Sequence, residues 1–187
     1  FSEHKAYYRL ECYEEFPLVI ALTEANDNLS LQVHPDDMAA RKLENRRFGK
    51  NESWYFLQSP GYIHNGCKCS NLEDLQEALS TGDADLFAEK LAVNQGDYVF
   101  VEAGTLHALS AGSLVYEIEE NCQLTYRVSD FGRVDARGNA RELHIDKALQ
   151  SIKLGRQSRT ESYDEPKEER LYTTVLLHNV SSYRNAS

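Results

Sequence analysis

The most constraining feature of the sequence is a short stretch of alternating apolar and polar residues from Leu29 to His34, followed by Pro35. Side chains of a β-strand point to opposite faces in turn, so Ser30, Gln32 and His34 are expected to share one face. Pro35 cannot donate a backbone hydrogen bond to a sheet, so it ends the strand. A polar row of this kind is typical of a strand with a solvent-exposed face. A metal site inside a barrel also requires a polar row of this kind. The choice between an exposed face and a metal site therefore depends on the other polar residues of the chain.

Short β-prone segments recur along the chain at intervals of roughly 8–12 residues, with turn residues between them. The predicted strands are 16–22, which we expect to be buried, and 29–34, 53–57, 98–101, 105–109, 114–119, 124–128 and 171–177. The 11 tyrosines and 7 phenylalanines also favour strands over a helix bundle. This pattern predicts a mainly β protein built as a sandwich or barrel.

Helical segments interrupt the predicted strands in a few places. The expected helices are 36–44, a small inserted helical pair at about 71–92, and a C-terminal helix at 143–152. Residues 155–170 are polar and charged and contain one proline, a composition typical of a linker. We therefore expect a core over residues 1–154, a polar linker at 155–170, and a further strand after it.

Charge and composition narrow the partners and the location of the protein. A net charge of -10 argues against nucleic acid, because binding to a phosphate backbone needs a basic surface. No apolar run of roughly 18 residues is present, so we predict no transmembrane helix and no membrane partner. The four cysteines lack the spacing of a zinc ribbon, and the first residues carry no secretion signal. We therefore expect reduced thiols in a cytoplasmic protein.

Four polar residues from separate predicted segments have the chemistry of metal ligands. Gln32 and His34 share one strand face. Glu52 opens a later strand, and His107 follows a Gly-Thr turn. In a small jelly roll these segments can lie side by side, with inward side chains converging inside the barrel. Two imidazoles, a carboxylate and an amide oxygen suit Zn, Fe or Mn, and the chemistry alone does not choose among them.

The same residues lie within longer segments that resemble the type I mannose-6-phosphate isomerases, most of all their short bacterial form. The matching segments are LSLQVHPDD (29–37), GKNESWY (49–55), GTLHAL (104–109), TYRVSDFGRVD (125–135) and GNARELHIDKAL (138–149). The similarity runs in unbroken order over about residues 16–152. It implies a cupin-type jelly-roll barrel and one bound zinc ion per chain. Position by position, the implied zinc ligands are Gln32, His34, Glu52 and His107.

The resemblance also implies the reaction, which interconverts mannose 6-phosphate and fructose 6-phosphate, so the expected partner is a phosphorylated hexose. Such an isomerisation moves a proton between C1 and C2 through an enediol. Positions that line the family's active site are matched by Ser30, Lys50, Glu117 and Arg127. Lys50 and Glu117 are candidates for proton transfer, although a lysine base needs a lowered pKa. Arg127 keeps its proton, so we expect it to stabilise the enediolate or clamp the phosphate, with Ser30 and Lys50 as further substrate contacts.

The chain also departs from the family pattern, and other functions stay open. Gly49 stands where larger family members carry a histidine before the lysine. The family continues into a second cupin-like half, of which residues 171–187 would be only the start. One alternative is another metal-dependent cupin enzyme, such as an Fe-dependent dioxygenase, which would prefer two or three histidines with a carboxylate. The other is a non-catalytic cupin that binds a sugar phosphate. The sequence does not set the oligomeric state.

Overall fold

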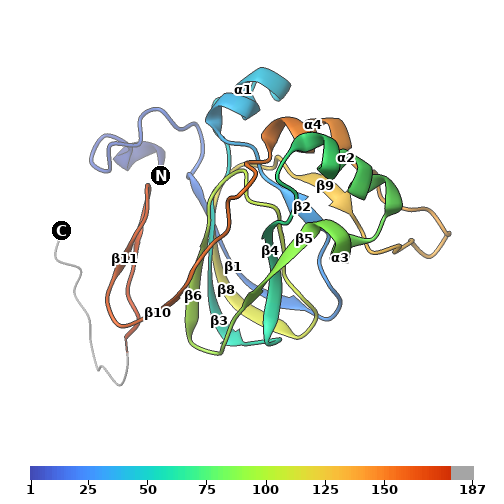
Figure 1. The fold of residues 1–187 in the computed structure, drawn as a ribbon. Helices are drawn as coiled ribbons and strands as arrows, with labels where there is room; N and C mark the ends of the chain where they lie inside the picture. Colours follow the sequence, from blue (N-terminus) through green and yellow to red (C-terminus); the bar gives the residue numbers. More distant parts are fainter. Residues whose placement is uncertain (178–187) are drawn as a thin grey trace.

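The alternating strands fold into two antiparallel sheets that pack face to face, and the structure, a computed structural model, describes residues 1–177 (Figure 1). The first sheet has the order β1-β8-β3-β6-β10, with β1 at Leu18–Ala25, β8 at Ser113–Glu120, β3 at Glu52–Gln58, β6 at Asp97–Val101 and β10 at Thr160–Ser162. The second sheet has the order β5-β4-β7-β2-β9, with β5 at Ala88–Ala92, β4 at Tyr62–Cys67, β7 at His107–Ala108, β2 at Leu31–Val33 and β9 at Tyr126–Ser129. The mainly β prediction is confirmed.

Helices cover the outer face of the second sheet (Figure 1). They are α2 at Leu72–Thr81, α3 at Ala84–Phe87 and α4 at Ile145–Ser151, while α1 at Asp37–Glu44 follows β2 and a 3₁₀ helix lies at Ser2–His4. Leu31 and Val33 are fully buried in a cluster with side chains from α2, α3 and α4, namely Leu75, Phe87 and Ala148. The apolar face of β2 therefore packs against helices, and its polar face points between the sheets. None of the helices in residues 1–177 has the length and apolar character that a membrane span requires.

A second apolar cluster fills the interior between the two sheets. It contains Trp54 and Phe56 of β3, Ile63 of β4, Val99 of β6 and Leu109 after β7. These side chains come from both sheets and are almost completely buried. Burial of large apolar side chains is the main favourable contribution to folding, so this cluster holds the sheets together around the polar residues described below.

The predicted helical pair at 71–92 is only partly right. The Asn71 side chain caps α2 by accepting a hydrogen bond from a backbone N–H, as its position predicts. The second helix ends at Phe87, and residues 88–92 form β5, which pairs with β4. Leu91 has helical spacing from Phe87, but strand pairing decides its conformation. β4 is also missing from the prediction, because the glycine and cysteine at its end have a loop-like composition.

β1 lies where the sequence predicts a buried strand at 16–22, but much of it is exposed. The strand starts at Leu18, pairs with β8 and forms an edge of the first sheet. Ile20 and Leu22 are 52% and 67% exposed. The prediction of burial is wrong because an apolar run does not reveal whether a strand is covered on both faces.

Residues 155–170, expected to be a polar linker, contain two strands. β10 extends the first sheet beside β6, and β11 (Lys167–Glu168) pairs with β12 (Thr173–Thr174) in a small hairpin. The predicted strand at 171–177 is therefore short, and its partner precedes it in the chain. Residues 178–187 lie outside the described part. The division into a core, a linker and the start of a second half stays a prediction.

Arg170 connects the end of this segment to the core. Its guanidinium donates hydrogen bonds of 2.8 Å to both carboxylate oxygens of buried Glu120, and one of 2.9 Å to Asp37. In the Arg170→Ala variant the buried carboxylate loses these donors, so we expect the free energy of unfolding to fall by about 1–3 kcal/mol. Urea denaturation followed by circular dichroism measures the loss.

The Lys90–Asp85 ion pair provides the control for this variant. Both side chains are well exposed, at 44% and 66%, and their charged groups are 2.9 Å apart. The Lys90→Ala variant should therefore lose less than about 1 kcal/mol. Equal losses in the two variants would contradict a specific role of Arg170 in holding residues 155–170 to the core.

Candidate metal centre and active site

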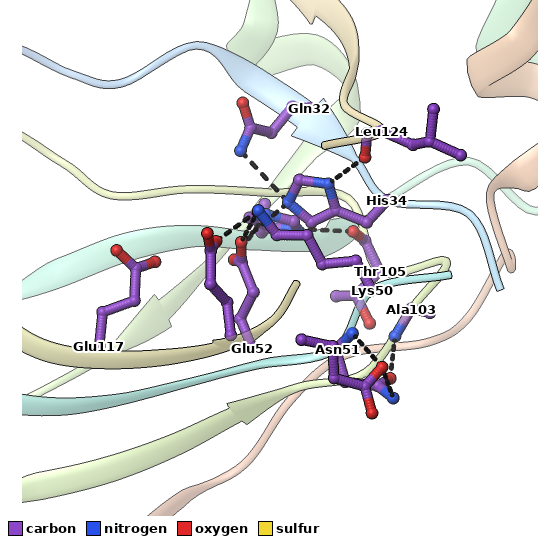
Figure 2. A network of polar contacts seen from close by, with 12 residues as sticks. Gln32, His34, Lys50, Asn51, Glu52, Ala103, Thr105, Glu117 and Leu124 are labelled. Atoms are coloured by element: carbon purple, nitrogen blue, oxygen red, sulfur yellow. Dashed lines mark hydrogen bonds and ion pairs between the residues drawn. The ribbon is translucent and has the colours of Figure 1, made fainter. Parts of the chain in front are cut away.

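His34, Glu52 and His107 come together between the two sheets, although they are far apart in the sequence. Figure 2 shows His34 and Glu52 of this group. His34 directly follows β2, Glu52 begins β3 and His107 begins β7. Nε2 of His34 lies 3.1 Å from Oε1 of Glu52, and Nε2 of His107 lies 3.5 Å from its Oε2. All three side chains are buried, and their possible ligand atoms lie within 4.8 Å of one another. The polar face of the 29–34 strand therefore lines a buried site and not a wet surface.

Hydrogen bonds on the far side of each imidazole fix the tautomer that a metal ligand needs. Nδ1 of His34 lies 2.9 Å from the carbonyl oxygen of Leu124, and Nδ1 of His107 lies 2.8 Å from that of Thr105. A carbonyl oxygen only accepts, so each Nδ1 carries a proton and each Nε2 can turn a lone pair to the site. Nε2 of His107 is buried and has no hydrogen-bond partner in residues 1–177. Metal-ligating histidines are usually oriented in this way.

The electrostatics of the cluster favour a bound cation. Burial lowers the pKa of His34, against the opposing effect of Glu52. Burial alone would raise the pKa of Glu52, but His34, His107 and Lys50 outweigh it and hold this pKa well below its usual range. The ionised carboxylate thus faces Nε2 of both rings, and a proton held between these groups offsets its charge. A divalent cation among these donors would take the place of that proton, and nitrogen and oxygen donors of this mix fit such an ion.

Gln32 lies beside the cluster with its amide nitrogen toward His34. Nε2 of Gln32 is 3.4 Å from Nε2 of His34, and its Oε1 accepts a hydrogen bond of 2.9 Å from the Ser30 hydroxyl. Half a turn of the amide group exchanges its nitrogen and oxygen, so the oxygen can face the site. Ser30 and Gln32 therefore lie together, as the alternation predicts. Their roles as substrate contact and metal ligand stay proposals.

Lys50 and Glu119 form an ion pair at the edge of the cluster, and the sequence-based prediction misses Glu119. Nζ of Lys50 is 3.0 Å from Oε1 of Glu52 and contacts Oε2 of Glu119. Burial alone would lower the pKa of Lys50, but the two carboxylates raise it above its usual value. Lys50 is therefore a cation and not the neutral amine that a lysine base requires. Glu119 follows Glu117 by two residues on β8, so strand periodicity alone could have placed both on one face.

Glu117 is held in place by hydrogen bonds to both of its carboxylate oxygens. Oε2 accepts from the Thr23 hydroxyl at 2.6 Å, and Oε1 accepts from Nε1 of Trp54 at 2.8 Å. Trp54 and Glu117 are opposite each other in the pairing of β3 with β8. The carboxylate thus lies on the sheet face that also carries Glu52, as the prediction of an active-site residue requires.

Arg127 lies on the opposite wall of the site. It is directly across from Gln32 in the pairing of β2 with β9, so the two side chains share a face. Its Nη1 donates to the carbonyl oxygen of Glu142 at 2.9 Å, while its Nε is buried without a hydrogen-bond partner in the part of the chain that the structure describes. The His144 N–H donates to the Arg127 carbonyl oxygen at 2.7 Å, and the Arg127 N–H donates to Nδ1 of the His144 ring at 3.3 Å. A positive group with unused donors therefore stands beside the predicted metal ligands.

No protein-family model matches the chain, but comparison with individual known proteins does show its family. The chain is 40% identical over 141 residues to "Probable mannose-6-phosphate isomerase GmuF" of Bacillus subtilis, covering 74% of the chain and 45% of that protein. It is 34% identical over 158 residues to a mannose-6-phosphate isomerase of Streptococcus mutans, covering 83% of the chain and 50% of that protein. The chain belongs to the mannose-6-phosphate isomerase family.

The structural match confirms the fold predicted for this mannose-6-phosphate isomerase family member. The crystal structure of the mannose 6-phosphate isomerase from Bacillus subtilis matches with a TM-score of 0.77 and 31% identity. The match covers 92% of this chain and 55% of that one. The cupin-type jelly roll is therefore the fold of the chain. The chain spans about half the length of the curated relatives that it matches.

Gly49 fixes the backbone before Lys50 in this family member. A Cβ atom at Gly49 would lie 2.2 Å from the carbonyl oxygen of Pro35 and 2.6 Å from the carbonyl carbon of Asp36. The Gly49 N–H donates to a carboxylate oxygen of Asp37 at 2.7 Å, and the Lys50 N–H donates to the Pro35 carbonyl at 3.1 Å. The histidine expected in larger family members therefore does not fit here without movement of the backbone.

The Gly49→Ala variant tests this close approach. Because the new methyl group meets backbone atoms, we expect it to lower the free energy of unfolding by about 3 kcal/mol. Gly138→Ala is the matched control, since nothing lies within 4 Å of its Cβ position and only its φ of +84° opposes the change. That variant should lose about 1 kcal/mol. Thermal and urea unfolding measure both, and a loss at Gly49 no greater than at Gly138 would contradict the packing argument.

Proposed function

We propose that the protein is a zinc-dependent aldose–ketose isomerase that interconverts mannose 6-phosphate and fructose 6-phosphate through an enediol. The observation that carries the proposal is the buried cluster of His34, Glu52 and His107, whose ring nitrogens face an ionised carboxylate. Family membership supports the reaction, since the relatives are named for it. The chain spans about half of the length of these relatives, so the activity for which they are named is a proposal for this chain.

One zinc ion per chain would be held by two ring nitrogens and two side-chain oxygens, from His34, His107, Glu52 and Gln32. When bound, the ion supplies a Lewis acid without redox chemistry, which stabilises negative charge on the sugar oxygens at C1 and C2. Gln32 is neutral, so the site keeps more positive charge than a second carboxylate would leave. Iron and manganese suit the same donors, so the identity of the ion has to be measured.

Glu117 is the residue that we assign to proton transfer, and Lys50 supplies positive charge. The proton leaves C2 of mannose 6-phosphate and returns to C1, while the hydroxyl proton at O2 passes to O1, which gives fructose 6-phosphate. Glu117 fits the role of acceptor because Thr23 and Trp54 hold its carboxylate in one orientation. Lys50 is protonated beside two carboxylates, so its part in catalysis is to place a charge near the sugar oxygens.

Arg127 and Ser30 are the proposed contacts to the anionic parts of the substrate, together with Lys50. The unpaired Nε of Arg127 leaves the guanidinium able to bind an enediolate or a phosphate through two donors. Arg133 and Arg141 are less available, because both bond to Asp130, at 2.5 and 2.8 Å. Arg127 is therefore the arginine of this group that we assign to the substrate.

We also propose a cytoplasmic location and a phosphorylated hexose as the partner. None of the four cysteines is in a disulfide bond within residues 1–177, which supports a reducing compartment. The net charge of -10 does not favour nucleic acid as a further partner.

Metal content and turnover test the proposal together. Purified protein should hold about one equivalent of zinc and convert mannose 6-phosphate, as measured by elemental analysis and a coupled assay. His34→Ala and His107→Ala should lose the metal and lower kcat by at least about 100-fold. His64→Gln, which changes a buried histidine outside the cluster, should keep the metal and the activity.

Three results of this experiment have different meanings. Full isomerase activity in metal-free protein would contradict the zinc mechanism. Iron in place of zinc, with oxygen consumption, would support a dioxygenase. Binding of metal and mannose 6-phosphate without turnover would support the non-catalytic sugar-phosphate-binding cupin.

The Arg127→Ala variant separates catalysis from metal binding. We expect kcat to fall roughly 100-fold with zinc content unchanged, because the guanidinium stabilises charge and is not a metal ligand. Steady-state kinetics and elemental analysis on the same preparation measure both. Arg137→Ala, an exposed arginine in the following loop, is the control and should behave as wild type. An unchanged rate in Arg127→Ala would remove Arg127 from the mechanism.

A further inference from the structure

Glu52 and Glu119 stand directly opposite each other on neighbouring strands. They are a cross-strand pair of β3 and β8, so their side chains share the face that points between the sheets. Like charges in this position destabilise a sheet. The Glu52 side chain is 3% exposed and that of Glu119 22% exposed, so water screens their repulsion poorly. An amide or an apolar residue at position 119 would avoid this cost, which indicates that the carboxylate has a use there.

The ammonium group of Lys50 lies between the two carboxylates and offsets their repulsion. Its Nζ is 3.0 Å from Oε1 of Glu52 and contacts Oε2 of Glu119. The Lys50 side chain is 9% exposed, so its charge depends on these partners. An ammonium group has three N–H donors, and within residues 1–177 the two carboxylates are the acceptors that it contacts. One donor is left for an oxygen of a bound molecule.

Glu52 is not able to hold Lys50 in place alone. Its Oε1 lies 3.1 Å from Nε2 of His34 as well as 3.0 Å from Nζ of Lys50, so this oxygen is shared. If Glu52 is a metal ligand, the bound cation would also neutralise much of its negative charge and weaken its attraction to Lys50. Glu117 does not replace it, because within residues 1–177 the carboxylates that form ion pairs with Lys50 are those of Glu52 and Glu119. Glu119 is therefore the carboxylate of this group that is committed to Lys50.

We propose that Glu119 is a positioning residue, which holds the Lys50 ammonium at the edge of the metal cluster with one donor directed to a substrate oxygen. The inference rests on the proposed function, which gives Lys50 its substrate. Glu119 touches neither the metal nor the sugar in this scheme, and it acts through Lys50. Loss of Glu119 therefore has consequences only while Lys50 is present.

A double-mutant cycle tests this dependence. Glu119→Gln should lower kcat/KM roughly 10-fold, and the change should fall on the same constant, kcat or KM, that Lys50→Met changes. Adding Glu119→Gln to Lys50→Met should cost less than about a further two-fold, because the residue to be positioned is gone. Glu119→Asp keeps the charge and should recover part of the loss. Zinc content should stay at the wild-type level in Glu119→Gln.

The Glu24→Gln variant is the matched control for Glu119→Gln. Glu24→Gln removes one exposed carboxylate from β1 of the same sheet and should behave as wild type. Independent, multiplying losses in the double variant would overturn the proposal, as would an unchanged Glu119→Gln enzyme. Loss of zinc in Glu119→Gln would make the residue part of the metal site and would also overturn it.

Nuclear magnetic resonance of the lysine ammonium groups separates this inference from the proposed function. The buried, paired Lys50 should give a slowly exchanging NH₃⁺ signal, assigned by its disappearance in Lys50→Met. That signal should be lost in Glu119→Gln and kept in Glu24→Gln. If the wild type neither binds nor converts mannose 6-phosphate, the proposed function is contradicted. The NH₃⁺ signal still shows in that case whether Glu119 holds the Lys50 ammonium group in place. A signal that persists in Glu119→Gln would reject the positioning role whatever the activity.

Discussion

The buried carboxylate of Glu52 is the group on which the rest of the site depends. A charge taken out of water costs several kcal/mol unless neighbouring groups compensate for it. Glu52 is 3% exposed, and its compensation comes from His34, His107 and Lys50. These partners belong to different segments, and the two histidines are in the other sheet. The carboxylate is therefore satisfied only when the two sheets have closed on each other, so the site and the fold stabilise each other.

The register of the second sheet explains why the proposed metal ligands and an arginine lie next to each other. β2 lies between β7 and β9, and Gln32 is opposite His107 on one side and near Arg127 on the other. One row of side chains across these strands thus combines metal-binding groups with a cation. A phosphorylated sugar carries both oxygens that a metal can bind and an anion that an arginine can bind. The same row exists only because helices cover the opposite, apolar face of β2.

Local sequence predicts much of this arrangement, and tertiary partners account for the remainder. The alternation around Gln32 and His34 gives the right strand and the right face, and Asn71 marks the start of α2. Burial of β1 and the conformation of 88–92 are missed, because each depends on which strand lies alongside. Glu52 and His107 are found through their chemistry and the family resemblance. No local pattern predicts their contact, because they belong to separate segments of the chain.

Glu119 and residues 155–170 show a further limit of reading the sequence. Glu119 has the periodicity of an active-site residue, but Glu117, Glu119 and Glu120 together look like a solvated acidic run. The structure separates them, since Glu119 contacts Lys50 while Glu120 is bound by Arg170. Polar composition at 155–170 likewise conceals a strand that adds to β6. The position of such a polar residue in the fold therefore depends on the charged groups that it contacts, and these come from other segments of the chain.

X-ray absorption at the metal edge of the purified protein measures the donor atoms of the proposed centre most directly. We predict zinc surrounded by nitrogen and oxygen at about 2.0–2.1 Å, with the outer scattering of imidazole rings from His34 and His107. Sulfur donors at about 2.3 Å would instead place the metal on cysteines such as Cys67 and Cys69. That result would contradict a metal centre built around Glu52.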